Sequence, residues 1–132
     1  MRRLLRFLLA LAVLPAFAAP AMASTYFVRT DGGDTRQCTG LSDSAYPGRG
    51  SSQPCAWKHP FHALPPDSKP RIAGGDTLII GPGDYMIGYG ASGSEDTCSS
   101  DWPWDCHMSA IPSGPSANQP TRLVGKTDNG KC

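Results

Sequence analysis

The scarcity of large aliphatic side chains is the feature that most constrains the fold of this chain. From Ser24 onward, thirteen of 109 residues are Leu, Ile, Val or Phe, well below the roughly one-fifth at which a chain buries an ordinary core. The same part carries nine basic and eleven acidic residues, so charge repulsion does not explain the composition. Two explanations remain open: disulfides stabilise a small core, or sequence beyond this chain completes it.

The first 23 residues have the pattern of a secretory signal peptide. Arg2, Arg3 and Arg6 precede an uncharged apolar stretch, and "AMA" at 21–23 offers a small-residue cleavage site before Ser24. A membrane anchor is the alternative, although the two prolines in the stretch would interrupt an anchor helix. We therefore expect a secreted protein, extracellular or periplasmic, with no membrane span after cleavage.

The charge of the expected mature part does not suit a nucleic-acid-binding protein. Its net charge is −2 with neutral histidines, and cationic residues such as Arg29, Arg49, Lys69 and Arg122 are scattered along the sequence. Binding to a polyanion needs clustered Lys and Arg. We expect no nucleic-acid partner.

All five cysteines lie in the exported part, where thiols oxidise: Cys38, Cys55, Cys98, Cys106 and Cys132. Cys38–Cys55 and Cys98–Cys106 are the favoured pairs because each would close a short polar loop, although four cysteines allow three pairings. Cys132 stays unpaired within this chain. Its terminal position favours the interpretation that the chain is the N-terminal piece of a longer protein.

The pattern along the chain predicts short strands and long loops. Strands are expected at 24–30 ("STYFVRT"), 76–80 ("DTLII"), 85–89 ("YMIGY") and 121–126 ("TRLVGK"), with irregular loops over 37–54 and 90–120. Trp57, Phe61 and Leu64 form one apolar stripe that nearby prolines limit to about a helical turn or two. No ordinary helix is predicted, so the fold class is all-β. Since "GPG" is not a hairpin signal, coiled strands are favoured over hairpins.

Four segments in the right order resemble a known family. "TYFVRTDGGD", "HPFHAL", "GGDTLIIGPGDY" and "QPTRLVGK" are similar to the opening of secreted right-handed parallel β-helix proteins of the pectate-lyase-like superfamily. The segment from Gly75 to Tyr85 is the most specific. The proline-rich "ALPPDSKPRIAGG" replaces the short helix usual in the family, and both disulfide loops are additional.

The resemblance implies the N-terminal cap and first coils of a solenoid. Residues 24–70 would form a cap region with one disulfide loop, and residues 71–132 the first coils with a second, long one. Leu78 and Ile80 would face inward and Ile79 outward or toward the cap, because side chains alternate along a strand. The core would be thin because each coil buries its apolar face against the next coil.

The resemblance also implies a polysaccharide-directed function. We expect a protein that acts on or binds extracellular polysaccharide, as a polysaccharide lyase or glycoside hydrolase if it is an enzyme. No catalytic residue is assigned, because the family's catalytic residues lie on central coils, past residue 132. A non-enzymatic surface or matrix solenoid and a small disulfide-rich binding domain are the alternatives.

The second disulfide loop holds the candidate binding residues. Two tryptophans lie among carboxylates in "EDTCSSDWPWDC": Glu95, Asp96, Asp101, Trp102, Trp104 and Asp105. Such a loop can cover the end of the solenoid through its tryptophans, contact sugar through Trp102, Trp104, Asp101 and Asp105, or, as the weakest alternative, bind calcium.

No cofactor is expected. Cys55, His59 and His62 have spacings that zinc could use, but in an exported protein the cysteines favour disulfides. "GYGASG" at 88–93 matches a dinucleotide fingerprint without the helix that the motif needs.

Overall fold

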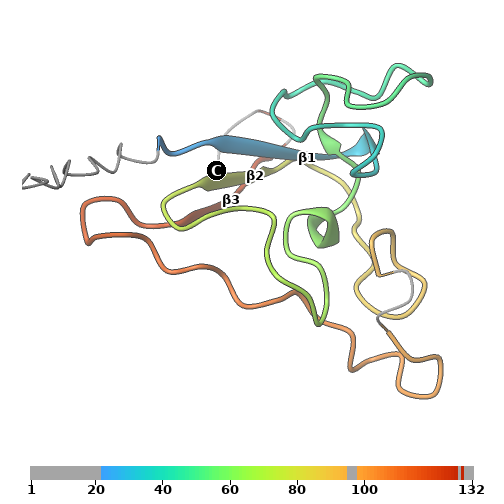
Figure 1. Cartoon of the computed structure of the whole chain (residues 1–132). Helices are drawn as coiled ribbons and strands as arrows, with labels where there is room; N and C mark the ends of the chain where they lie inside the picture. Colours follow the sequence, from blue (N-terminus) through green and yellow to red (C-terminus); the bar gives the residue numbers. More distant parts are fainter. Residues whose placement is uncertain (1–21, 95–97, 128, 130–132) are drawn as a thin grey trace, which may run out of the picture.

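The computed structural model describes residues 22–94, 98–127 and 129. It contains three strands, β1 (Thr25–Gly33), β2 (Thr77–Ile80) and β3 (Arg122–Gly125), and one turn of 3₁₀ helix, η1 (Pro60–His62). Irregular chain connects them, and the described ranges contain no α-helix, so the all-β class fits (Figure 1).

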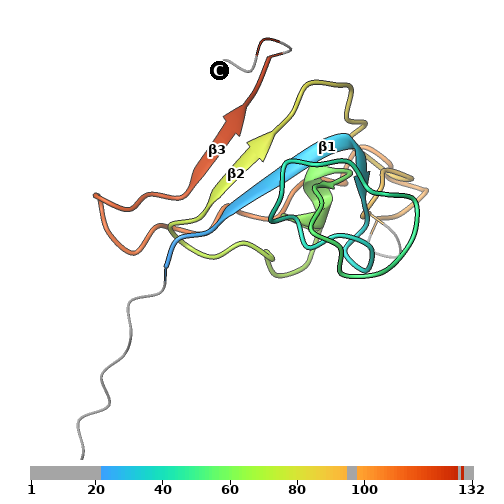
Figure 2. The same cartoon turned by 90° about the horizontal axis from the view of Figure 1, so that it is seen from above.

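The strands form one parallel sheet in the order β1-β2-β3 (Figure 2). They stack in register, so that Tyr26 pairs with Leu78 and Leu78 with Leu123. Consecutive parallel strands need long crossover connections, because a tight turn reverses the chain direction. The parallel pairing agrees with the expectation that the chain coils instead of forming hairpins.

The expected strand at 85–89 is wrong: this segment is irregular. Its aromatic and aliphatic residues are typical of a strand, but its backbone groups bond elsewhere. The carbonyl of Met86 accepts a hydrogen bond from the His59 ring at 2.9 Å, and the Tyr89 N–H donates to the carbonyl of Pro103 at 3.0 Å. These tertiary bonds hold the segment away from the sheet.

The main core lies between the sheet and the chain that surrounds η1. It consists of Val28, Cys38, Cys55, Trp57, Ala63, Leu64, Ile72 and Leu78. Trp57 stacks on Tyr26 with ring centroids 5.1 Å apart and donates its indole N–H to the carbonyl of Cys38 at 3.0 Å. Leu78 is fully buried and Ile80 packs against the core, as the strand alternation predicts.

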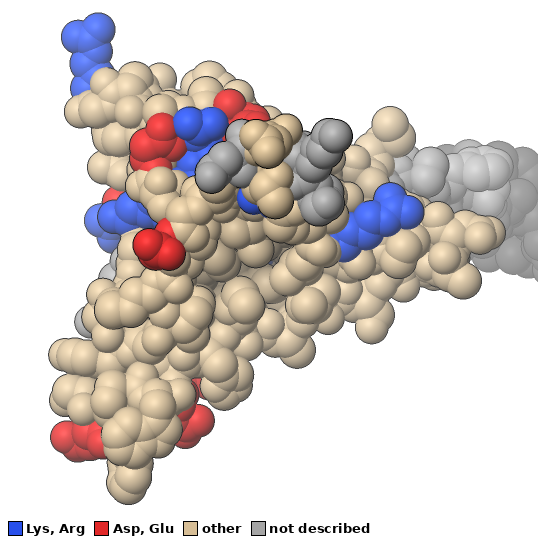
Figure 3. Space-filling view, turned by 180° about the vertical axis from the view of Figure 1, so that it is seen from behind, with Lys and Arg blue, Asp and Glu red and all other residues tan. Residues whose placement is uncertain are grey.

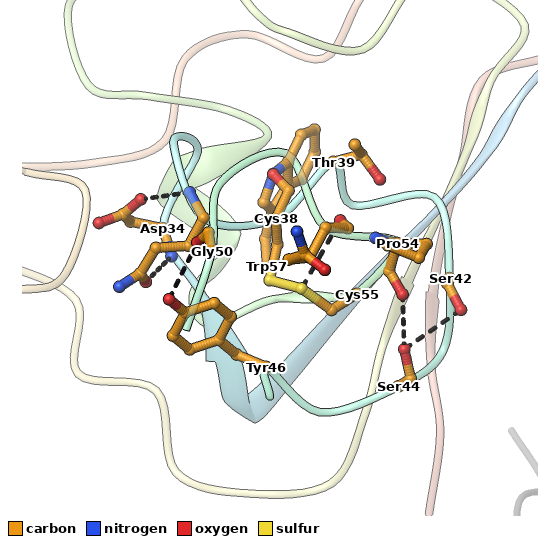
Figure 4. The surroundings of a disulfide bond; sticks show 12 residues. Asp34, Cys38, Thr39, Ser42, Ser44, Tyr46, Gly50, Pro54, Cys55 and Trp57 are labelled. Atoms are coloured by element: carbon orange, nitrogen blue, oxygen red, sulfur yellow. Dashed lines mark hydrogen bonds between the residues drawn. A yellow bond between two sulfur atoms is a disulfide. The ribbon is translucent and has the colours of Figure 1, made fainter. Parts of the chain in front are cut away.

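The loop closed by Cys38–Cys55, which we call the core loop, is built into this core (Figure 4). Both sulfurs belong to buried residues. The loop also follows the edge of β1 that faces away from β2: Phe27 N–H donates to Gly40 at 2.8 Å, and the Tyr46 N–H donates to Asp31 at 2.9 Å. The core loop therefore covers a strand edge that would otherwise be open to pairing with another chain.

Candidate functional site

The loop between Cys98 and Cys106, which we call the tryptophan loop, lies at the periphery of the molecule, far from the three strands (Figure 1). The two cysteines form a disulfide, so both pairs favoured by the loop spacing are present. Trp102 is 62% exposed and Trp104 74%. The interpretation that these rings cover the end of the fold is therefore wrong.

The two indole rings are arranged edge to face. Their centroids are 5.7 Å apart and their planes are perpendicular. Asp101 and Asp105 flank them and are also exposed. Glu95 and Asp96, the other acidic residues of the sequence motif, lie outside the described residues. The arrangement presents two aromatic surfaces in different directions, with carboxylate acceptors beside them.

Backbone contacts fix the tryptophan loop to the rest of the fold. Within the loop, the Asp105 N–H donates to the Trp102 carbonyl at 3.1 Å. The bond from Tyr89 to Pro103 joins the loop to the segment 86–89, and Cys106 is buried in a small second cluster with Phe61 and Ala91. The disulfide and these contacts restrict the loop, so that little conformational entropy remains to be lost when a ligand binds.

The segment beside the loop is exposed and apolar as well. Met86, Ile87 and Tyr89 are each at least half exposed. Exposed apolar groups of this size near one another are uncommon on monomeric proteins and mark contact sites. On the face drawn in Figure 3, this end of the molecule shows acidic residues and no Lys or Arg, whereas positive and negative residues lie together at the opposite end.

Two buried histidines in and beside η1 support this region. His59 caps η1: its Nδ1 accepts from the Phe61 N–H at 3.1 Å, so Nε2 carries the proton donated to Met86. The Nε2 atom of His62 lies 3.1 Å from the Ser92 hydroxyl. Burial lowers the pKa of His59, and burial, with the nearby Lys58, lowers that of His62 to about 4. Both rings are neutral at pH 7 and serve as packing groups.

These contacts also bear on the zinc alternative. Cys55 and Cys106 are in disulfides, and both nitrogens of His59 bond to backbone groups. Within residues 22–94, 98–127 and 129, no group of three or more His, Cys, Asp or Glu side chains has a geometry that could hold a metal ion. The same residues contain no helix long and apolar enough to cross a membrane.

A second candidate lies at the carboxyl ends of the strands. An open pocket of about 390 Å³ is lined by residues of β1, of the core loop and of the chain after β2 and β3: Arg29, Thr30, Asp31, Asp43, Gly81, Pro82, Lys126 and Thr127. Arg29 binds Asp31 at 2.7 Å and Asp43 at 3.3 Å, and Lys126 binds Asp43 at 3.1 Å.

The pocket is unsuited to acid catalysis. The hydrogen bond from Arg29 lowers the pKa of Asp31. Burial opposes the change at Asp43, but the bonds from Lys126 and Arg29 still lower its pKa. Both carboxylates are ionised at neutral pH, whereas glycoside hydrolysis needs one carboxyl that retains its proton.

Sequence reasoning missed this group of charges. It treated Arg29 as a scattered surface cation and ended the first strand at residue 30, before Asp31. The structure extends β1 through Gly33, and the parallel register places Arg29 close to Gly81 and Lys126. The available signal was Lys126 at the end of the expected strand 121–126, and it becomes informative only when the strand register is known.

Comparison of the chain with protein-family models, with curated proteins and with solved structures finds no match. The resemblance to the β-helix superfamily therefore rests on the sequence segments quoted above.

Proposed function

We propose that the protein is exported and binds a neutral extracellular polysaccharide through the tryptophan loop. The observation that carries the proposal is the exposed, edge-to-face pair of Trp102 and Trp104 in a loop closed by a disulfide. A sugar ring has an apolar C–H face that packs on an aromatic ring, and hydroxyls that donate to carboxylates such as Asp101 and Asp105. Two disulfides suit an oxidising, extracytoplasmic environment.

The acidic residues of the loop favour a neutral polysaccharide over a polyuronate. Asp101 and Asp105 flank the rings, and no Lys or Arg occurs between Cys98 and Cys106. Uronate groups that approach the rings would meet carboxylates of the same sign, at a cost that salt reduces. A preference of this kind would distinguish the protein from a polyuronate-degrading enzyme.

Binding measured by calorimetry tests the proposal. The exported full chain should bind a soluble neutral glucan or mannan more tightly than polygalacturonate. Trp102→Ala and Trp104→Ala should each weaken that binding at least about tenfold. Leu41→Ala, at an exposed apolar position of the core loop, is the matched control and should bind normally. Equal binding by the tryptophan variants, or a preference for polygalacturonate, would contradict the proposal.

We also propose that the chain forms the N-terminal cap and first coils of a right-handed parallel β-helix. The in-register stack of consecutive parallel strands supports this architecture. The core loop covers the outer edge of β1, whereas β3 has no strand on its outer edge among the described residues. A further coil would pair there.

If further coils carry a lyase or hydrolase site, the tryptophan loop would hold the substrate for it. Without such a site, the protein is a non-enzymatic binding solenoid or a small binding domain. The mass of the natural secreted product, with and without reduction, separates these alternatives. A product longer than residues 24–132, with Cys132 linked to a later cysteine, supports the solenoid. A product of residues 24–132, alone or as a Cys132-linked dimer, contradicts it.

A further inference from the structure

Asp76 is a buried carboxylate with an unusual set of partners. It directly precedes β2 and is 4% exposed. Its Oδ1 accepts from the Ser24 N–H and its Oδ2 from the Ala73 N–H, both at 2.7 Å. Buried carboxylates are normally paired with a cation. The ion pairs found among the described residues join Arg29 to Asp31 and Asp43, and Lys126 to Asp43, and none includes Asp76.

The N–H that Asp76 binds belongs to the residue after the expected signal cleavage site. Ser24 follows "AMA" at 21–23, and Met22 and Ala23 are exposed. Hydrolysis of the Ala23–Ser24 peptide bond consumes one water. It leaves a carboxylate on Ala23 and an α-amine on Ser24, which takes up a proton to become an ammonium at neutral pH. That ammonium has three donors, and its nitrogen already lies within hydrogen-bond distance of Asp76.

We propose that Asp76 is the built-in acceptor for a new N-terminus at Ser24, so that removal of residues 1–23 replaces a hydrogen bond from a neutral amide N–H with a partly buried ammonium–carboxylate ion pair. This inference rests on the export part of the proposed function. A full positive charge on the donor adds Coulomb attraction to the carboxylate that a neutral amide donor does not supply. Cleavage therefore supplies a cation to a carboxylate that has no cationic partner among the described residues.

The ion pair would fasten the starts of all three strands. The Ser24 carbonyl accepts from the Thr77 N–H, and the Asp76 carbonyl accepts from the Arg122 N–H, both at 2.9 Å. Ser24, Asp76 and Arg122 thus lie on neighbouring strand starts, where the first residues of β1, β2 and β3 align (Figure 2). Cleavage before Ser24 would therefore stabilise the end of the parallel sheet at which all three strands begin.

The first test is the N-terminus of the exported product. The full chain is expressed in a bacterium that exports it, and the product is sequenced from its N-terminus. We expect Ser24 as the first residue. A product that begins at another residue would overturn the inference. Failure of export would overturn the export part of the proposed function as well, whereas loss of polysaccharide binding alone would leave this inference intact.

The second test is the pKa of the α-amine, measured by NMR from the pH dependence of the Ser24 carbon shifts in ¹³C-labelled protein, which leaves the amine unmodified. Its ordinary value is about 7.7–8.0, and we expect a value at least one unit higher, which is a tenfold lower deprotonated fraction at a given pH. Tyr26 faces the same carboxylate, and burial and the charge of Asp76 raise its pKa, so its titration is followed in parallel. Asp76→Asn should return the amine to its ordinary value, and Asp84→Asn, at an exposed position, should not.

A chemical experiment tests the inference even if Asp76→Asn does not fold. Periodate cleaves an unprotected N-terminal serine and removes its amine. The folded product should react at least tenfold more slowly than the same product in urea, and the oxidised protein should unfold at a lower temperature. An unshifted amine pKa with rapid periodate cleavage in the folded state would overturn the inference.

Discussion

The two disulfide loops have opposite relations to the core. In the core loop, both cysteines are buried in the same cluster as Trp57, and backbone bonds tie the loop to the edge of β1. In the tryptophan loop, Cys106 is buried, but both tryptophans point into solvent. The two disulfide bonds therefore have different roles. In a chain with few aliphatic residues, one disulfide extends the core, and the other holds an exposed binding surface in place.

Removal of each disulfide in turn should distinguish most clearly between the role in core stability and the role in binding. Cys38→Ala with Cys55→Ala should lower the free energy of unfolding by about 3–5 kcal/mol, because a long closed loop and buried sulfur are both lost. The Cys98–Cys106 disulfide closes a shorter loop. Cys98→Ala with Cys106→Ala should therefore lower the free energy of unfolding by only about 2 kcal/mol, and it should weaken polysaccharide binding. Urea unfolding measures both. Equal losses of stability and unchanged binding would abolish the distinction between the loops.

A methyl group added to the core loop should show how tightly it packs. The Cβ of Gly40→Ala would lie 2.7 Å from the ring of Trp57, at a residue with φ +77°. We expect a loss of about 4 kcal/mol from overpacking and backbone strain together. Gly48→Ala is the matched control: φ is +79° with nothing within 4 Å, so it should cost only about 1 kcal/mol. Similar losses in the two variants would show that the core loop packs loosely against Trp57.

Acid should act on the histidines that support the tryptophan loop. The pKa of His62 is about 4 in the folded protein and near 6.5 when unfolded, so the unfolded chain binds more protons between these values. Stability is therefore complete above pH 6.5 and should fall by about 3 kcal/mol as the pH falls to 4. His59 contributes with the same sign. Urea unfolding at several pH values measures the slope.

His62→Gln is the variant that checks this origin of the acid sensitivity. It should flatten the stability profile between pH 6.5 and 4, whereas His107→Gln, at an exposed position, should leave the profile unchanged. If His62→Gln retains the full slope, another group causes the acid sensitivity.

The smallest effect on stability is expected in the tryptophan loop itself. Trp102→Ala and Trp104→Ala should each change the free energy of unfolding by no more than about 0.5 kcal/mol, because both side chains are mostly exposed. Trp57→Ala, which removes a buried ring of the same type, should cost about 3–5 kcal/mol. Thermal unfolding of the three variants provides the comparison. A large loss in either loop variant would show that its ring packs against the fold.

The sequence predicted those parts of the fold that local patterns determine. β2 was found because Leu78, Ile79 and Ile80 form an apolar run between glycine turns, and the disulfide pairs followed from loop length. The segment 85–89 has an equally good strand pattern, yet its backbone bonds to His59 and Pro103. Tertiary partners of this kind cannot be read from local periodicity.

The sequence identified residues of the candidate site but not their exposure or their ion pairs. Trp102 and Trp104 were identified from composition, but their exposure depends on where the loop packs. The ion pairs among Arg29, Asp43 and Lys126 depend on strand register. The hydrogen bond between Ser24 and Asp76 likewise depends on the alignment of β1 and β2, because the two residues are 52 positions apart in the chain.

Quenching of tryptophan fluorescence by iodide, with and without the polysaccharide, tests the central claim most directly. The structure predicts a quenchable fraction from Trp102 and Trp104 and a protected fraction from Trp57, which is 5% exposed. A saturating neutral polysaccharide should protect the quenchable fraction, and that fraction should be absent from the Trp102→Ala/Trp104→Ala double variant. If the quenchable fraction persists unchanged at saturation, the exposed pair is not the binding surface, and the account is wrong.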